Sequence, residues 1–142
     1  MHVERTFMVD RPIEDVFDYL SDFEHTNEWD PGTVETTRTS GDGGLGTTYA
    51  NTSQFVGRRV ELTYTTVGYE RPTFFSCQGK NSSSTATDSM TFTRHGERTQ
   101  IHYRADFVFH GVVKLIAPFV VKPKLSDLAD ETIEDIRTAL EK

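Results

Sequence analysis

A few side chains in this sequence could transfer protons if the fold brought them into an apolar pocket. Asp88 lies two and four residues before Met90 and Phe92, so a strand would place all three on one face. Tyr64 and Tyr103 alternate with apolar neighbours in the same way. Burial raises the pKa of a carboxyl group, and a buried phenol can direct a proton at a carbonyl. Asp88, Tyr64 and Tyr103 are therefore the candidate catalytic residues.

Each candidate also has a structural interpretation, which we favour. Asp88 would then be a solvated strand end, and each tyrosine would pack with one satisfied hydroxyl. A short predicted helix places Asp22, His25 and Asn27 at the border of a pocket mouth, where Asp22 would only cap the helix. No nucleophile motif, phosphate-binding loop or dinucleotide fingerprint accompanies these residues. The residues alone do not define a catalytic set.

The histidines and the single cysteine do not indicate a metal or redox site. His102 and His110 stand eight residues apart on one predicted strand, and the other histidines lack ligand spacing. Cys77 has no second cysteine to pair with and lies in a strand-like run, so we predict a buried thiol. We expect no metal and no cofactor.

Length and composition predict one globular domain over residues 1–142. The formal net charge of -7 and the scattered basic residues disfavour nucleic-acid binding. The N-terminus shows no secretory signal pattern. The longest apolar run, residues 112–121, contains Lys114 and Pro118 and is too short to span a bilayer. We expect a cytoplasmic monomer or homodimer without stable membrane insertion.

The chain begins with a predicted strand and two helices. Residues 3–9 alternate as a strand does, and Pro12 then suits the start of a helix. Apolar residues at positions 13, 16, 17 and 20 have the spacing of one buried helical face. A shorter helix over residues 23–28 ends at Trp29, which we interpret as a packing anchor.

The middle of the chain has the texture of an antiparallel sheet. Turn residues separate six runs rich in Thr, Val, Tyr and Phe, and alternation gives the clearer runs one apolar and one wet face. In two runs, alternation does not decide which face points inward. Phe74 and Phe75 are adjacent in one, and in the other either Tyr49 or the side with Thr48 and Ala50 could point inward. The predicted strands are residues 33–39, 46–55, 59–69, 73–80, 85–94 and 99–110.

Residues 123–142 form a predicted amphipathic helix that must bury its apolar stripe on the sheet. The stripe is small at its middle, at Ala129 and Thr132. Side chains of low volume fill less of the space beneath a sheet. We therefore expect any pocket below this part of the helix.

The segment of residues 111–122, before that helix, is more apolar than a connector needs to be. Pro118 and Pro123 disfavour a regular helix through it. We favour a hydrophobic lid packed on the sheet edge, since apolar segments are usually buried. The alternatives are a mobile flap at a cavity mouth and a patch that meets a membrane or a partner.

The order of strand, two short helices, six strands and long helix is the helix-grip arrangement. This is an α+β fold in which a curved antiparallel sheet of about seven strands wraps around the C-terminal helix. Local motifs add to this pattern, and with them the whole chain resembles the SRPBCC superfamily of START-like and birch-pollen-allergen-like proteins, especially its polyketide cyclase/dehydrase and lipid-transport branch. These motifs are residues 12–22, Trp29-Asp30-Pro31, residues 44–49, Gly57-Arg58 and Glu70-Arg71-Pro72.

The resemblance implies an elongated apolar cavity between the concave face of the sheet and the C-terminal helix. Members of the superfamily use such a cavity for lipids, sterols, polyketides or plant metabolites, and a minority catalyse cyclisation or dehydration in it. The shared architecture specifies the fold better than the function.

We expect a non-enzymatic protein that binds or transports a small hydrophobic ligand, lipid-, sterol- or polyketide-like. One alternative is a cofactor-independent polyketide aromatase/cyclase or dehydratase that uses the cavity tyrosines or an acid. A second is an interaction or regulatory protein that docks through residues 112–121. The expected cavity residues are Trp29, Tyr49, Leu62, Tyr64, Phe75, Met90, Phe92, Tyr103, Phe107, Leu125, Leu128, Ala129 and Thr132.

Overall fold

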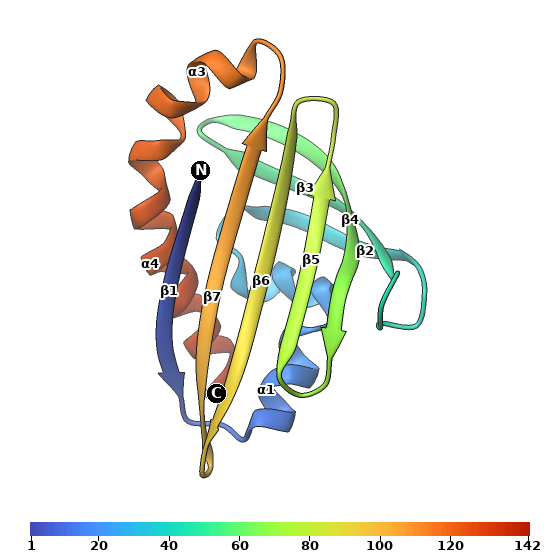
Figure 1. Ribbon diagram of the computed structural model, residues 1–142, viewed down its shortest axis with the longest axis vertical. Helices are drawn as coiled ribbons and strands as arrows, with labels where there is room; N and C mark the ends of the chain where they lie inside the picture. The colour runs from blue at the N-terminus through green and yellow to red at the C-terminus, as the bar shows by residue number, and fades with distance from the viewer.

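The computed structural model describes residues 1–142 and shows the predicted helix-grip fold. One seven-stranded antiparallel sheet, with strand order β1-β7-β6-β5-β4-β3-β2, curves around the long helix α4 (Figure 1). Helices α1 and α2 close one part of the concave side. The elements are β1 (His2–Val9), α1 (Ile13–Leu20), the 3-10 helix η1 (Phe23–His25), α2 (Thr26–Trp29), β2 (Thr33–Ser40), β3 (Thr48–Phe55), β4 (Arg58–Glu70), β5 (Phe74–Lys80), β6 (Ser84–His95), β7 (Arg98–Phe109), α3 (Val113–Val120) and α4 (Lys122–Leu140).

Helix α1 begins directly after Pro12, whose extended backbone precedes the first helical turn. Its apolar face is buried as predicted, and Phe17 packs edge-on against Tyr69 of β4 and Phe92 of β6. Edge-to-face aromatic pairs stabilise a core beyond the area that they bury. Helix α1 thereby closes one end of the space beneath the sheet.

The two runs with an undecided face are resolved in the structure. Tyr49 and Phe75 are fully buried, whereas Ala50 is exposed and Phe74 and Thr48 are half-buried. The predicted burial of Cys77 is confirmed. Because side chains alternate along a strand, these two assignments fix the inward face of β3 and β5.

Helix α4 is longer than any other helix, and its two halves pack in different surroundings. Ile136 and Leu140 belong to the main core, together with residues of α1 and the middle strands. Leu125 belongs instead to a small separate cluster with Ala117 of α3 and Val121. The part of α4 between the two clusters has no such packed core below it.

The segment before α4 departs from the prediction. Residues 113–120 form a helix, α3, with Pro118 inside it, and only Ala117 and Val121 of this segment are buried. The preferred interpretation as a packed lid is wrong, because most of the apolar side chains of α3 face solvent. The proline is compatible with the helix since the carbonyl four residues before it belongs to exposed Lys114, where water can take the place of the missing N–H.

Candidate ligand cavity

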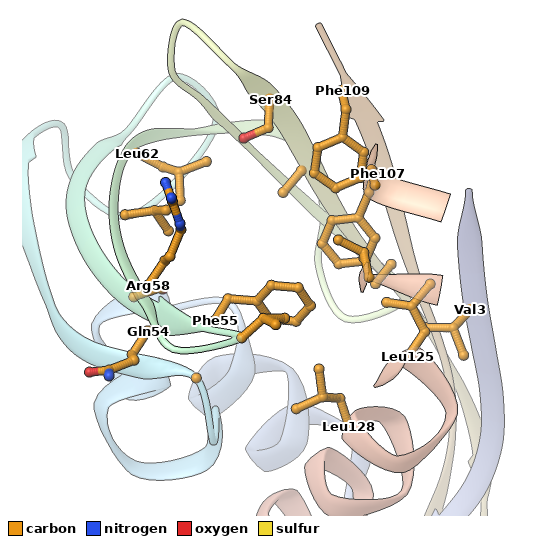
Figure 2. A pocket seen from close by; sticks show the side chains of 18 of the residues that line it. Val3, Gln54, Phe55, Arg58, Leu62, Ser84, Phe107, Phe109, Leu125 and Leu128 are labelled. Carbon is orange, nitrogen blue, oxygen red and sulfur yellow. The ribbon is translucent and has the colours of Figure 1, made fainter. Parts of the chain in front are cut away.

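A cavity of about 530 Å³ lies between the concave face of the sheet and helices α3 and α4 (Figure 2). Hydrophobic residues make up 19 of the 30 residues that line it. Its volume falls within the range of pockets that enclose small organic molecules. Such a cavity, mostly apolar with a few polar groups, is the default binding site in a protein of this size.

Small side chains on the sheet and on α4 border this open space. Gly79 of β5, Ala86 of β6 and Phe107 of β7 follow Tyr64 of β4 in one row across the sheet. A Cβ atom at Gly79 would lie 2.6 Å from Cζ of Tyr64, so the tyrosine ring lies flat over the glycine. Ala129 of α4 faces the same space. Small side chains therefore border the cavity from both sides, Ala86 from the sheet and Ala129 from α4.

The apolar end of the cavity is formed by elements that meet near α3. Phe107 and Phe109 of β7 stack with their ring centroids 6.4 Å apart, and both pack against the small cluster of Leu125. Phe55 of the β3–β4 hairpin packs against the same cluster. Ile116 of α3 also lines the cavity. This end is the cavity mouth.

A carboxyl group and a phenol lie on the sheet side of the cavity. Asp88 faces inward from β6, and the Tyr103 hydroxyl donates a hydrogen bond of 2.7 Å to its Oδ1 atom. Burial raises the pKa of Asp88 to about 7, although the hydrogen bond from Tyr103 acts in the opposite direction. Burial and the neighbouring carboxyl group raise the pKa of Tyr103 well above its ordinary value. Near neutral pH, Asp88 can therefore either accept or donate a proton.

A second carboxyl group, Asp30, lines the cavity from the turn that follows α2. It accepts hydrogen bonds from the Thr33 hydroxyl at 2.7 Å and from the Gly32 backbone N–H at 3.3 Å. Burial is the largest influence on Asp30 and raises its pKa. The Tyr64 hydroxyl also borders the cavity and has no hydrogen-bond partner in the protein. The cavity thus contains two acids and two phenols, with one free phenol donor.

The structure brings the three candidate catalytic residues onto one cavity wall. Asp88, Tyr64 and Tyr103 all line it, and the interpretation of Asp88 as a solvated strand end is wrong. Asp88 lies in the interior of β6, where its partner on β7 is Ala105, a small residue that leaves room in front of the carboxyl group. The predicted cavity residues that lie on the wall are Leu62, Tyr64, Tyr103, Phe107, Leu125, Leu128, Ala129 and Thr132.

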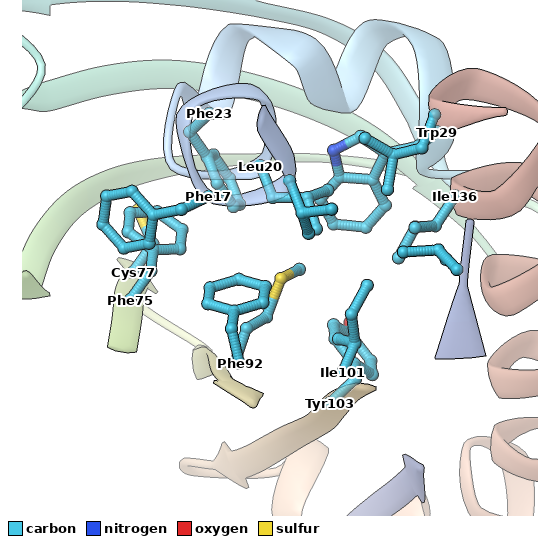
Figure 3. Packing of buried hydrophobic residues seen from close by; sticks show 14 of the residues in the cluster. Phe17, Leu20, Phe23, Trp29, Phe75, Cys77, Phe92, Ile101, Tyr103 and Ile136 are labelled. Carbon is cyan, nitrogen blue, oxygen red and sulfur yellow. The ribbon is translucent and has the colours of Figure 1, made fainter. Parts of the chain in front are cut away.

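The other predicted cavity residues lie in the packed core beside the cavity. These side chains form one buried cluster with residues of α1 and η1 such as Phe17 and Phe23 (Figure 3). They share the inward face with the cavity residues, but the helices cover them. They are Trp29, Tyr49, Phe75, Met90 and Phe92.

The expectation that the η1–α2 region borders the mouth through three polar residues is wrong. Asp22 caps η1 by accepting from the Glu24 backbone N–H, which confirms its structural interpretation. The His25 ring stacks on Tyr19. The Asn27 side chain hydrogen-bonds both backbone polar groups of Thr36. All three side chains make local contacts within the helical region or to β2, and none of them lines the cavity.

Sequence reasoning missed Asp30 and the α3 side chains that line the cavity. The signal that could have found Asp30 is its place in the chain, because it directly follows Trp29, the predicted packing anchor. The α3 contribution depends on where the helix sits at the sheet end, which a local pattern does not specify.

This architecture, a curved sheet with a cavity beneath a C-terminal helix, defines a helix-grip protein. A family model described as "Polyketide cyclase / dehydrase and lipid transport" matches residues 1–141, and the chain belongs to this family. The match covers the whole architecture described above. No functionally curated protein matches the sequence.

Solved structures share the fold over nearly the whole chain. The Zhui aromatase/cyclase from Streptomyces sp. R1128 is 16% identical with a TM-score of 0.82, covering 99% of this chain and 93% of its own. A protein from Thermus thermophilus is 10% identical with a TM-score of 0.82, covering 99% and 97%. A START superfamily protein from Mycobacterium smegmatis is 15% identical with a TM-score of 0.73, also covering 99% and 97%. At these identities the likeness establishes the fold alone.

Proposed function

We propose that the protein binds a small, mostly apolar ligand in the cavity between the sheet and α4. The observation that carries the proposal is a cavity of about 530 Å³ with predominantly hydrophobic walls. Burying apolar ligand surface there would supply most of the affinity. The family, which is described by polyketide chemistry and lipid transport, supports a ligand of this kind.

The polar groups narrow the chemistry of the ligand. Tyr64 offers a donor without a protein partner, and Asp88 when protonated offers a second. When ionised, Asp88 and Asp30 would repel an anionic ligand group at this wall. We therefore propose a neutral ligand whose carbonyl or hydroxyl oxygen meets Tyr64 and Asp88, with its hydrocarbon part toward the cavity mouth.

Native mass spectrometry and organic extraction of the purified protein test this proposal. We expect an apolar compound to co-purify with the wild type. The Ala86→Leu substitution fills space at the cavity floor and should remove the bound compound. Ala50→Leu, on the exposed outer side of β3, adds the same volume outside the cavity and should retain it. Retention by both variants would place the compound elsewhere and refute the proposal.

A second candidate function is a cofactor-independent cyclase or dehydratase. The observation that favours it is the pairing of Asp88, whose pKa is about 7, with Tyr103 inside the apolar cavity. In a dehydration, the Asp88 carboxylate would take the proton from the carbon next to a ligand carbonyl. The electron pair would form a carbon–carbon double bond as the β-hydroxyl leaves, and that hydroxyl would take a proton from Tyr64 to leave as water.

Turnover of an aromatic β-hydroxyketone, followed by the absorbance of its conjugated product, tests this second candidate. We expect a rate that rises through about pH 7 as Asp88 loses its proton. Asp88→Asn should abolish that turnover and leave binding of the ketone intact. Binding without turnover in the wild type would favour the binding protein, whereas turnover that survives Asp88→Asn would remove Asp88 from the chemistry.

A further inference from the structure

Helix α3 exposes a continuous apolar surface at the cavity mouth. Val112, which precedes α3, and Leu115, Ile116 and Phe119 within it follow helical spacing and share one face, which we call the mouth patch. The exposed fractions are 76% for Val112, 73% for Leu115, 53% for Ile116 and 81% for Phe119. Neighbouring exposed apolar side chains of this size mark an interaction surface more often than isolated ones do.

Basic residues without acidic partners surround the mouth patch. Residues 53–60 and 107–126, which form the β3–β4 hairpin and the α3 region, hold five of the 15 basic residues and none of the 22 acidic ones. The five basic residues are exposed and form no ion pair, unlike most arginines elsewhere in the molecule. They are Arg58, Arg59, Lys114, Lys122 and Lys124.

At the opposite end of the molecule, by contrast, acidic side chains are paired with arginines: Asp15 with Arg11, Asp18 with Arg71 and Glu14 with Arg94. Helix α1, which lies far from α3 in Figure 1, carries Glu14, Asp15 and Asp18 on its outer side. In a chain of net charge -7, five of the eight basic residues that form no ion pair thus lie in the β3–β4 hairpin and the α3 region. Such a charge distribution turns these two regions toward an anionic surface during an encounter.

We propose that the cavity mouth docks on an anionic lipid bilayer. The mouth patch would enter the boundary between headgroups and acyl chains, and the five basic residues would meet lipid phosphates. A helix with large apolar side chains on one face and lysines at its rim has the pattern of interfacial helices. No helix of the protein is long and apolar enough to cross the bilayer, so the docking is peripheral.

Charge decides between a bilayer and a second copy of this chain. Two copies that met through the mouth patch would bring together the five basic residues of each copy. Like charges across an interface are destabilising. A bilayer that contains anionic lipids offers the complementary charge and the apolar interior at once. Residues of the same two regions, including Val56, Arg58 and Val113, also line the cavity. Docking would therefore open the cavity directly toward the bilayer, whatever compound the cavity binds.

Vesicle flotation of the purified full-length protein without added ligand tests the docking. We expect binding to vesicles of phosphatidylcholine with phosphatidylglycerol, weak binding to phosphatidylcholine alone, and loss of binding in high salt. Lys114→Glu with Lys122→Glu should weaken the binding by about fivefold or more for each residue. Phe119→Ser should weaken it by about tenfold or more, because a buried phenyl group is lost.

Matched controls separate these effects from general changes of surface. Leu45→Ser removes an apolar side chain that is 70% exposed but lies in the turn before β3. Arg38→Glu with Lys142→Glu makes the same change of net charge away from the mouth. Both controls should bind anionic vesicles as the wild type does.

Three results would overturn the docking proposal. The first is wild-type protein that floats with neither kind of vesicle. The second is equal binding by the mouth and control variants. The third is a homodimer in analytical ultracentrifugation that Phe119→Ser dissociates, because a second copy would then cover the mouth patch. None of them bears on whether the cavity binds an apolar compound, which the mass-spectrometry experiment decides separately.

Discussion

The space beneath the sheet is divided into a filled region and an empty one, although the same strands form the floor of both. Near α1, the inward positions of adjacent strands carry Phe75, Met90 and Phe92, which are buried in the main core. Farther along the same strands, the inward positions carry Gly79, which the Tyr64 ring covers, and Ala86, which lines the cavity. The difference shows that side-chain size at a few register positions and the reach of α1 and η1 across the sheet together set the extent of the cavity.

The polar wall lies at the boundary between the two regions. Tyr103 packs edge-on against Trp29 of the core, with ring centroids 6.4 Å apart, while its hydroxyl reaches Asp88 in the cavity. The core thus holds the phenol ring in place, and the cavity receives its polar end. This arrangement keeps a half-buried carboxyl group among the mostly apolar residues of the cavity wall.

The largest expected effect is the difference in stability between the two regions. Phe17→Ala should lower the free energy of unfolding by about 3–5 kcal/mol, since it leaves a void in close-packed surroundings. Leu128→Ala should cost less than about 2 kcal/mol, because that half-buried side chain already borders the cavity. Urea unfolding of both variants measures the two values. Equal losses would mean that both regions are packed alike.

The next effect is a pH dependence from the polar wall. Asp88 keeps its proton up to about pH 7 in the folded state but releases it near the ordinary value of 3.8 when unfolded. The folded state therefore binds more protons between these values, so the free energy of unfolding should fall as pH rises from about 4 to 7. The slope contributed by Asp88 is at most about 1.4 kcal/mol per pH unit.

Asp88→Asn isolates this contribution from the other carboxyl groups. The variant cannot lose a proton at this position, and its amide oxygen can still accept from Tyr103. Urea unfolding at several pH values should show a flatter decline for the variant than for the wild type. Parallel curves for the two proteins would mean that Asp88 titrates normally and lies in water.

A smaller effect is expected at Gly79, which lies beneath the Tyr64 ring. Gly79→Ala would force the Tyr64 ring away from the sheet, because the added Cβ atom would lie 2.6 Å from Cζ. We expect a loss of about 1–3 kcal/mol in the free energy of unfolding. In a Tyr64→Ala background the same substitution should cost much less, and a double-mutant cycle measures the coupling. Additive losses would show that the ring does not depend on the glycine.

The sequence predicted the faces of the sheet better than the limits of the cavity. Alternation placed Tyr64, Asp88 and Tyr103 on the inner face, because side-chain direction along a strand is a local property. The same alternation also placed Phe75 and Met90 there, and it could not tell that helices cover them. Coverage depends on how far α1 and η1 reach across the sheet, which is a tertiary property.

The α3 region illustrates the same limit. Its apolar residues and its proline suggested a buried, irregular segment, yet it is an exposed helix at the sheet end. Apolar composition predicts burial only where a partner surface is within reach. Asp30 shows the converse, because it lines the cavity although its neighbour Trp29 is buried in the packed core.

The most direct test of the central claim, that the region around Ala86 is an open apolar binding cavity, is a titration with the neutral fluorescent probe N-phenylnaphthylamine. We predict a saturable rise in fluorescence for the wild type and for Ala50→Leu, and little or none for Ala86→Leu. Circular dichroism would establish that all three proteins are folded. A wild type that fails to bind the probe, or an Ala86→Leu variant that binds it equally well, would contradict the account.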